Sequence, residues 1–292
     1  MQNSLGVLLS VSTLLLWSVG DFYIQKSTRL VGIWKSLFFI SFFGMVLELP
    51  FVWVEVQKIF LSPQSLILLV VLGLSIFLAA LLDFEALKRG KIAVVEPVFG
   101  LGIPFTVFLA VVSGHDILSL TQSLLIGAIF IGIILSVVVK GSFRYDRIIW
   151  EKGVFIAILG TLAMALTNFL TGIGSQLISP LMTIWFINFF LTITTFVYLF
   201  AKGEWRSLPN DLRRHSKVIL EESLFDNIAW LSYAFAMTLI PISISTSIAE
   251  SYIVMAVLLG VSVNKETLNR HQVLGVILAV LGVISLSLTV TG

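Results

Sequence analysis

Ten long apolar stretches, separated by short polar connections, dominate the pattern of this 292-residue chain. Each is about 20 residues long, the length that an α-helix needs to cross a hydrocarbon core of about 30 Å. The stretches lie near residues 4–25, 34–54, 65–87, 92–112, 119–139, 152–173, 180–201, 218–239, 241–262 and 272–290. The longest connection is the polar stretch from Lys202 to Lys217, which leaves no room for a soluble domain. The pattern predicts an all-α membrane protein with ten transmembrane helices.

The composition excludes a water-soluble fold. Hydrophobic residues make up 58% of the chain and charged residues 12%, and the mean hydropathy is +1.06, whereas a soluble domain is about 45–50% apolar and about 25% charged. The net charge of +2 is spread over short loops, so no basic face for nucleic acid is predicted. The chain has no cysteine, and its first residues, MQNS, carry no cationic leader, so we expect a first membrane helix rather than a cleaved signal.

The two halves of the chain resemble each other. At an offset of 147 residues, the segment 36–43 (SLFFISFF) overlays 183–190 (TIWFINFF), and Asp21-Phe22 overlays Asn168-Phe169. At an offset of 150, the matched pairs are Ala86 with Ala236, Asp116 with Glu266, Leu118 with Leu268, Gln122 with Gln272 and Gly132 with Gly282. We therefore expect two five-helix repeats, residues 1–146 and 147–292. Because five spans is an odd number, the repeats are predicted to be inverted relative to each other.

The distribution of lysine and arginine predicts the orientation. Seventeen of the 18 lie in connections that follow spans 1, 3, 5, 7 and 9, and only Lys58 lies on the opposite face. Cationic loops resist translocation, so the odd-numbered connections are predicted to be cytoplasmic and both termini to lie outside.

The segment from Asn264 to Val283, NKETLNRHQVLGVILAVLGV, has an acidic residue at a turn, then a glutamine, then two glycines seven residues apart. These residues are Glu266, Gln272, Gly275 and Gly282. The first half has a degraded copy in Asp116, Gln122 and Gly132, with Leu125 in place of the earlier glycine. This hairpin resembles the one before the last helix of the drug/metabolite transporter superfamily, EamA-type branch. The likeness in span count, duplication and length covers nearly the whole chain.

The resemblance implies a bundle in which helices 1–4 and 6–9 surround a central cavity, while helices 5 and 10 pack at the side. It also implies a small-molecule substrate, a multi-pass location in the cell inner membrane, and a monomer or homodimer. One expectation differs from the family, because ten-helix members are usually drawn with both termini in the cytoplasm.

Span 8 carries one helical stripe of acidic and aromatic residues at spacings of three or four: Glu222, Asp226, Trp230, Tyr233 and Met237. The stripe is predicted to face the cavity. A carboxylate at bilayer depth costs a few kcal/mol or more, so Asp226 is a candidate substrate or proton site, the alternative being a structural hydrogen bond. Trp230 and Tyr233 are candidates for a substrate platform, since aromatic faces attract amines, or for simple packing.

Span 9 begins at Pro241 and places Ser247 and Glu250 near its middle. Glu250 is the strongest candidate for a substrate or proton site. Ser247 belongs either to a polar wall beside Glu250 or to close helix packing, which favours small residues in membranes.

Span 4 holds Glu96, which is followed by Pro97 and Pro104, so the helix is easily kinked or broken and Glu96 is a further candidate binding residue. The alternative is an ion pair with Lys91 or Arg89 at the interface. Toward the cytoplasmic ends of spans 1 and 3, Asp21 and Asp83 are predicted to form interfacial ion pairs or a gate.

These features favour a secondary transporter, coupled to protons or to an inorganic cation, that moves an amino acid or amine-like solute. The motif GxxxxGK[ST] does not occur, so ATP drive within the chain is excluded. No Ser/His/Asp arrangement or histidine cluster supports an enzyme, and neither a cofactor nor a metal site is expected. The alternatives are a transporter of sugars or nucleotide sugars, and a non-transporting accessory or lipid-flipping subunit.

Overall fold

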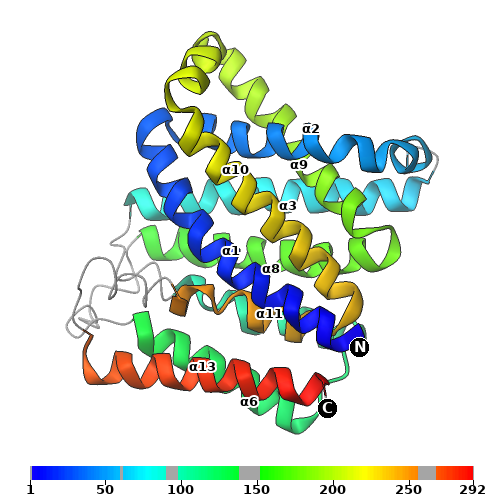
Figure 1. Ribbon diagram of the computed structural model, residues 1–292, viewed down its shortest axis with the longest axis vertical. Helices are drawn as coiled ribbons and strands as arrows, with labels where there is room; N and C mark the ends of the chain where they lie inside the picture. The colour runs from blue at the N-terminus through cyan, green and yellow to red at the C-terminus, as the bar shows by residue number, and fades with distance from the viewer. Residues whose placement is uncertain (1, 60–61, 90–97, 138–151, 256–267, 292) are drawn as a thin grey trace.

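The computed structural model describes residues 2–59, 62–89, 98–137, 152–255 and 268–291. These residues form helices joined by short connections (Figure 1). The helices are α1 (Gln2–Val31), α2 (Ile33–Ile59), α3 (Pro63–Arg89), α5 (Gly102–Val112), α6 (Leu120–Val137), α8 (Lys152–Leu177), α9 (Pro180–Ala201), the 3₁₀ helix η1 (Glu204–Ser207), α10 (Leu208–Leu239), α11 (Ile242–Ala249) and α13 (Arg270–Thr291). The predicted all-helical fold is confirmed.

Seven of the described helices are long and apolar enough to cross a membrane by length and composition, namely α1, α2, α3, α6, α8, α9 and α13. Two shorter apolar helices, Gly102–Val112 and Ile242–Met255, occupy the places of the fourth and ninth spans. The eighth span is α10, whose sequence includes Glu221, Glu222 and Asp226. Together they are the ten predicted helices.

The packing of the helices shows the duplication directly. α1 packs along α10, which is the first helix against the eighth, and α3 packs along α8, which is the third against the sixth. Likewise α5 contacts α8, which is the fourth helix against the sixth, and α1 contacts α11, which is the first against the ninth. The second helix packs against the seventh (α2 with α9) and the fifth against the tenth (α6 with α13). Each of these contacts has a counterpart with the two halves exchanged, as expected of two repeats related by a twofold axis.

The fifth and tenth helices form a pair at one side of the bundle (Figure 1). A Cβ atom added at Gly132 would lie 2.6 Å from the backbone nitrogen of Ala279, and one at Gly275 would lie 2.5 Å from that of Ser136. Only glycine permits this close approach of backbones, which is how membrane helices pack without a hydrophobic driving force. The glycines of the hairpin motif are therefore packing residues.

The glutamines of the same motif begin these two helices. Gln122 Oε1 accepts from the N–H of Ser119 at 3.0 Å, and the N–H of Gln122 donates to Ser119 Oγ at 3.2 Å. This reciprocal pair is a capping box. Gln272 Oε1 likewise accepts from the N–H of Asn269 at 2.9 Å, at the equivalent position of the second half.

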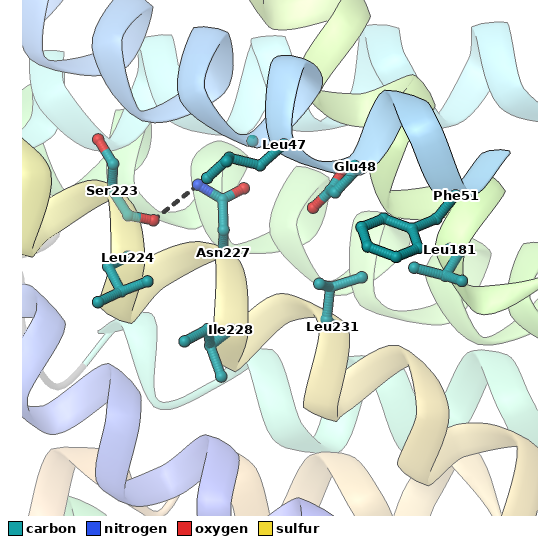
Figure 2. A pocket seen from close by; sticks show the side chains of 10 residues that line it. Leu47, Glu48, Phe51, Leu181, Ser223, Leu224, Asn227, Ile228 and Leu231 are labelled. Carbon is teal, nitrogen blue, oxygen red and sulfur yellow. Dashed lines mark hydrogen bonds between the residues drawn. The ribbon is translucent and has the colours of Figure 1, made fainter. Parts of the chain in front are cut away.

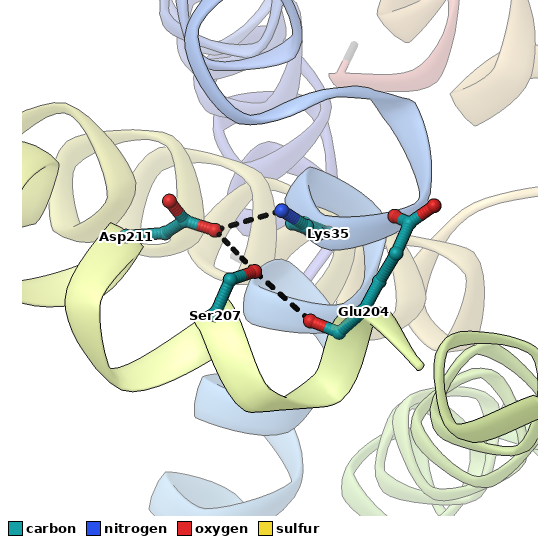
Figure 3. Close-up of polar contacts among 4 residues, drawn as sticks. All are labelled: Lys35, Glu204, Ser207 and Asp211. Atoms are coloured by element: carbon teal, nitrogen blue, oxygen red, sulfur yellow. Dashed lines mark hydrogen bonds and ion pairs between the residues drawn. The ribbon is translucent and has the colours of Figure 1, made fainter. Parts of the chain in front are cut away.

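The predicted polar connection from Lys202 to Lys217 is mostly helical. It contains η1 and the first residues of α10, which bends at His215 (φ −123°, ψ 23°). Asp211 accepts hydrogen bonds from Lys35 Nζ and Ser207 Oγ, both at 2.9 Å (Figure 3). The connection is therefore a helical turn held against the start of α2.

Both termini lie at the same end of the bundle (Figure 1), where Asn3 Nδ2 donates to the carbonyl oxygen of Val290 at 2.8 Å. An even number of crossings requires this arrangement. At the opposite end, Gly32 turns the chain from α1 into α2 with a φ of 90°, a conformation that favours glycine. Which end faces the cytoplasm stays a prediction from the charge distribution.

Candidate functional site

Aromatic rings fill the contact between α1 and α10 near the centre of the bundle. Trp17 of α1 lies 5.2 Å from Trp230, 5.1 Å from Tyr233 and 5.8 Å from Tyr252, measured between ring centroids. Tyr233 is fully buried, and its hydroxyl lies 2.7 Å from Thr246 Oγ1, which joins α10 to α11. These edge-on and tilted rings form an apolar wall with a few polar edges.

Glu250 lies beside this wall, where the ninth helix is interrupted. α11 ends just before it, and a tight turn follows in which the N–H of Ser251 donates to the carbonyl oxygen of Ile248 at 3.2 Å. Asn168 of α8 donates its Nδ2–H to Glu250 Oε1 at 2.8 Å. Glu250 also lies within electrostatic reach of the Tyr233 hydroxyl.

The fourth helix is interrupted at the equivalent place, 150 residues earlier. A turn at Gly100 and Leu101 precedes α5, and the N–H of Leu101 donates to the carbonyl oxygen of Val98 at 3.0 Å. Paired interruptions in corresponding helices of two repeats are typical of substrate sites in transporters, because irregular backbone at membrane depth is tolerated only where it is buried in protein or lines a cavity.

Several polar atoms of α8 and α11 are buried and have no hydrogen-bond partner among the described residues. They are Asn168 Oδ1, Thr171 Oγ1 and Ser175 Oγ of α8, and Ser243 Oγ of α11. The three α8 residues share one helical face, since they are spaced by three and four. A buried polar group without a partner costs about 1–3 kcal/mol, so this face of α8 carries uncompensated hydrogen-bonding groups.

The acids of α10 have different surroundings. Glu222 is fully buried and accepts from Ser27 Oγ at 2.7 Å and from Ser36 Oγ at 2.8 Å, so it ties α10 to α1 and α2. Asp226 is partly buried and lies close to the side chain of Trp230. Both residues belong to the stripe predicted for span 8, which here lies against α1 and α2.

Other predicted residues are placed as follows. Ser247 is fully buried and donates to the Ser243 carbonyl oxygen at 2.7 Å within its own helix. Asp21 is exposed on α1, whereas Asp83 is partly buried on α3 beside Gly160 of α8. The gate therefore stays a prediction, and Glu96 lies outside the described residues.

Sequence reasoning missed Asn168 as the partner of Glu250, and Trp17 and Tyr252 as members of the aromatic cluster. One signal was present for Asn168, which overlays Asp21 at the offset of 147. Nothing in the sequence marked Trp17 or Tyr252, because an aromatic residue in an apolar span is ordinary. Among the described residues no group of three or more histidine, aspartate or glutamate side chains is arranged to hold a metal ion.

Two repeats of apolar helices with paired interruptions are typical of multi-pass membrane transporters. A model of the EamA-like transporter family matches residues 4–138 and 151–288, once in each half. The chain belongs to this family and is a membrane transporter of the drug/metabolite transporter type. Comparison with curated proteins by sequence gives no match.

A solved structure supports the fold. The chain is similar to a protein of known crystal structure with a TM-score of 0.71 and 14% sequence identity. The likeness covers 98% of this chain and 97% of the other. At this identity the likeness shows the fold alone and carries no information on the substrate.

Proposed function

We propose that the protein is a secondary transporter that carries a small amine or amino acid across the cell inner membrane by alternating access, coupled to protons. The observation that carries the proposal is the position of Glu250. It is an acid in the interruption of the ninth helix, held by Asn168 and flanked by aromatic rings.

The chemistry around Glu250 suits such a substrate. An ionised carboxylate attracts an ammonium group, and the faces of Trp17 and Tyr252 favour a cation by cation–π attraction. The side-chain oxygen of Asn168, the residue that holds Glu250, has no partner among the described residues and can accept a hydrogen bond from the same group. When the substrate leaves, a proton can take its place on Glu250, which would couple the two movements.

The twofold arrangement supports alternating access. The exchanged contacts α1–α10 and α3–α8 are equivalent under the repeat. Rocking of one repeat against the other would loosen one of these contacts while it tightened the other, so the central site would open to one side of the membrane at a time.

The test is substrate-induced proton flux in proteoliposomes. The panel contains amino acids, polyamines, quaternary ammonium compounds and sugars, and the variants are Glu250→Gln and Asp226→Asn. We expect amines or amino acids to move protons through the wild type, and Glu250→Gln to abolish this flux.

Flux driven by sugars would overturn the substrate class. If no solute moved protons and isotope uptake were also absent, an accessory or lipid-flipping role would replace transport. Unchanged flux in Glu250→Gln would remove Glu250 from the site.

A further inference from the structure

The connection between α5 and α6 reaches from the first half of the chain onto the second. α5 ends in a Schellman motif, in which the N–H of His115 donates to the carbonyl oxygen of Ala110 at 3.1 Å. The N–H of Gly114 donates to the carbonyl oxygen of Val111 at 3.0 Å, and Gly114 has a φ of 76°, a conformation that favours glycine. This turn leads the chain back to the bundle, where Asp116 is buried at 5% exposure.

Two side chains of this connection contact helices of the second half, and we call these contacts the clasp. Asp116 accepts from the N–H of Ser243 at 2.6 Å and from that of Ile242 at 3.2 Å, so it caps the first turn of α11. The ring of His115 lies edge-on to that of Phe169 of α8, with the centroids 5.8 Å apart. The clasp therefore joins the first half to α8 and α11, the two helices that lead to the candidate site.

α8 and α11 run antiparallel between the clasp and Glu250. Gln176 of α8 donates to a carbonyl oxygen in the last turn of α10, just before α11 begins. One turn deeper in the bundle, a Cβ atom at Gly172 would lie 2.5 Å from Ile242 Cδ1. Deeper still, Asn168 holds Glu250 just past the end of α11. Since α11 has eight residues, the path from the clasp to Glu250 is about 12 Å long at about 1.5 Å per residue.

A surface hollow of about 270 Å³ lies at the clasp. Its lining includes His115, Asp116, Gln176 and Pro241, together with the last residues of α10. Because the α5–α6 and α10–α11 connections follow the fourth and eighth helices, the hollow lies at the end of the bundle that holds both termini (Figure 1). Every residue of α11 is buried, so the clasp separates this hollow from the inside of the bundle.

Polar groups lie buried on both helices beyond the clasp. Thr171 and Ser175 of α8 are 0% and 3% exposed, and Ser243 of α11 is 0% exposed. The hydroxyl oxygens of all three have no hydrogen-bond partner among the described residues. Contact with water would relieve the cost of these unpaired groups, so they favour a state in which the clasp is open, and the clasp opposes that state.

We infer that the clasp is a gate at the end of the bundle that holds the termini. Asp116 bound to the first turn of α11 closes the central site at this end, and its release opens a path from the hollow along α8 and α11 to Glu250. Rocking of the two halves breaks the clasp because its two sides belong to different halves. The inference rests on the proposed function only in taking Glu250 as the central site.

A second set of buried bonds between the halves lies well before the end of α10 and supplies the control. Asn227 donates to the carbonyl oxygen of Ile40 at 3.1 Å and to that of Ser223 at 2.7 Å (Figure 2). Asn188 of α9 donates to Asn227 Oδ1 at 2.8 Å and to Glu48 Oε2 at 3.1 Å. Asn227→Ala therefore removes a buried bond between the halves and leaves the clasp intact.

The test uses single introduced cysteines, because the chain has none of its own. Ser243→Cys on α11 and Thr171→Cys on α8 replace hydroxyl groups that have no partner in the described part of the chain. The measurement is the rate at which a charged methanethiosulfonate reagent modifies each cysteine in the full-length protein in lipid nanodiscs. We expect Asp116→Ala to raise both rates by about fivefold or more, the shift in equilibrium that loss of a helix cap produces. Asp116→Asn should raise both rates by less, and Asn227→Ala should leave both unchanged.

Three results would overturn the gate. One is that neither rate changes in Asp116→Ala. Another is that only Ser243→Cys reacts faster, which would mean that the start of α11 frays without opening a path. The third is an equal rise in Asn227→Ala, which would mean a general loosening of the bundle.

The measurement needs no solute, so it separates the gate from the proposed function. If Glu250→Gln abolished transport while Asp116→Ala left both labelling rates unchanged, the gate alone would be overturned. If both rates rose in Asp116→Ala while no solute was transported, the gate would be supported and the proposed function would fail.

Discussion

At the scale of single residues, Gly44 makes room for the two amides beside Glu48. A Cβ atom at this position would collide with Asn227 Oδ1 and Asn188 Nδ2. We expect Gly44→Ala to lower the free energy of unfolding by about 1–3 kcal/mol, because an overpacked site must shift its neighbours. The measurement is the thermal unfolding midpoint in detergent.

The matched control is Gly20→Ala on α1. A Cβ atom there would lie 3.5 Å from Phe225 Cβ, an ordinary contact, so the midpoint should not fall. Equal midpoints for Gly44→Ala and the wild type would show that the amides are not held in place.

Asp211 gives a prediction on pH. Desolvation acts to raise the pKa of Asp211, but the hydrogen bonds from Lys35 and Ser207 and the Lys35 charge outweigh it, so the pKa lies below its usual 3.8. Because the pKa of Asp211 is lower in the folded than in the unfolded protein, its ionised form stabilises the fold at pH values above the unfolded pKa. This stabilisation is lost as the pH falls through the folded pKa. Asp211→Asn should therefore cost up to about 1 kcal/mol near neutral pH.

The check on Asp211 is the difference in unfolding midpoint between Asp211→Asn and the wild type, followed from neutral pH downwards. The difference should shrink as the pH falls below 3.8. A difference that stays constant over this range would mean that the ion pair with Lys35 does not stabilise the fold.

At the scale of helices, the contact between α6 and α13 depends on glycine. Gly132→Ala would place a methyl group against the α13 backbone. We expect a loss of about 1–3 kcal/mol, seen as a lower unfolding midpoint. Gly127→Ala on the same helix has open space around its Cβ and should leave the midpoint unchanged or raise it.

The start of α11 is held by an acid from another part of the chain. Asp116, in the connection between α5 and α6, accepts from the N–H of Ser243 at 2.6 Å and from that of Ile242 at 3.2 Å. Asp116→Ala should cost about 1–2 kcal/mol by removing this cap, and Asp116→Asn should cost less because one amide oxygen remains. If the two variants unfolded at the same temperature as the wild type, the cap would have no role in stability.

The elements were largely predictable from the sequence, because a span of about 20 apolar residues has few alternatives in a membrane. The bend at His215 and the helical start of α10 were not, since polar residues outside the membrane carry no periodic signal. The turn at Glu250 was also missed. An interruption was expected in span 4 because prolines weaken the helix there, but no proline follows Glu250 in span 9.

At the scale of the whole molecule, the duplication was visible in the sequence, but the partners of its acids were not. Polar and glycine matches revealed two halves because apolar matches are uninformative in a membrane protein. The contacts of Glu48 with Asn188 and of Glu250 with Asn168 join residues 140 and 82 positions apart. Such pairs depend on which helices pack together, which no local pattern in the sequence records.

The central claim is that Glu250 is the site where substrate and proton exchange. The most direct test takes the solute that the proton-flux assay identifies and measures its uptake into proteoliposomes under an imposed pH gradient. The proteins compared are the wild type, Glu250→Gln and the exposed control Glu204→Gln. The account predicts accumulation by the wild type and by Glu204→Gln, and none by Glu250→Gln at equal protein incorporation. Accumulation by Glu250→Gln at the wild-type rate would contradict it.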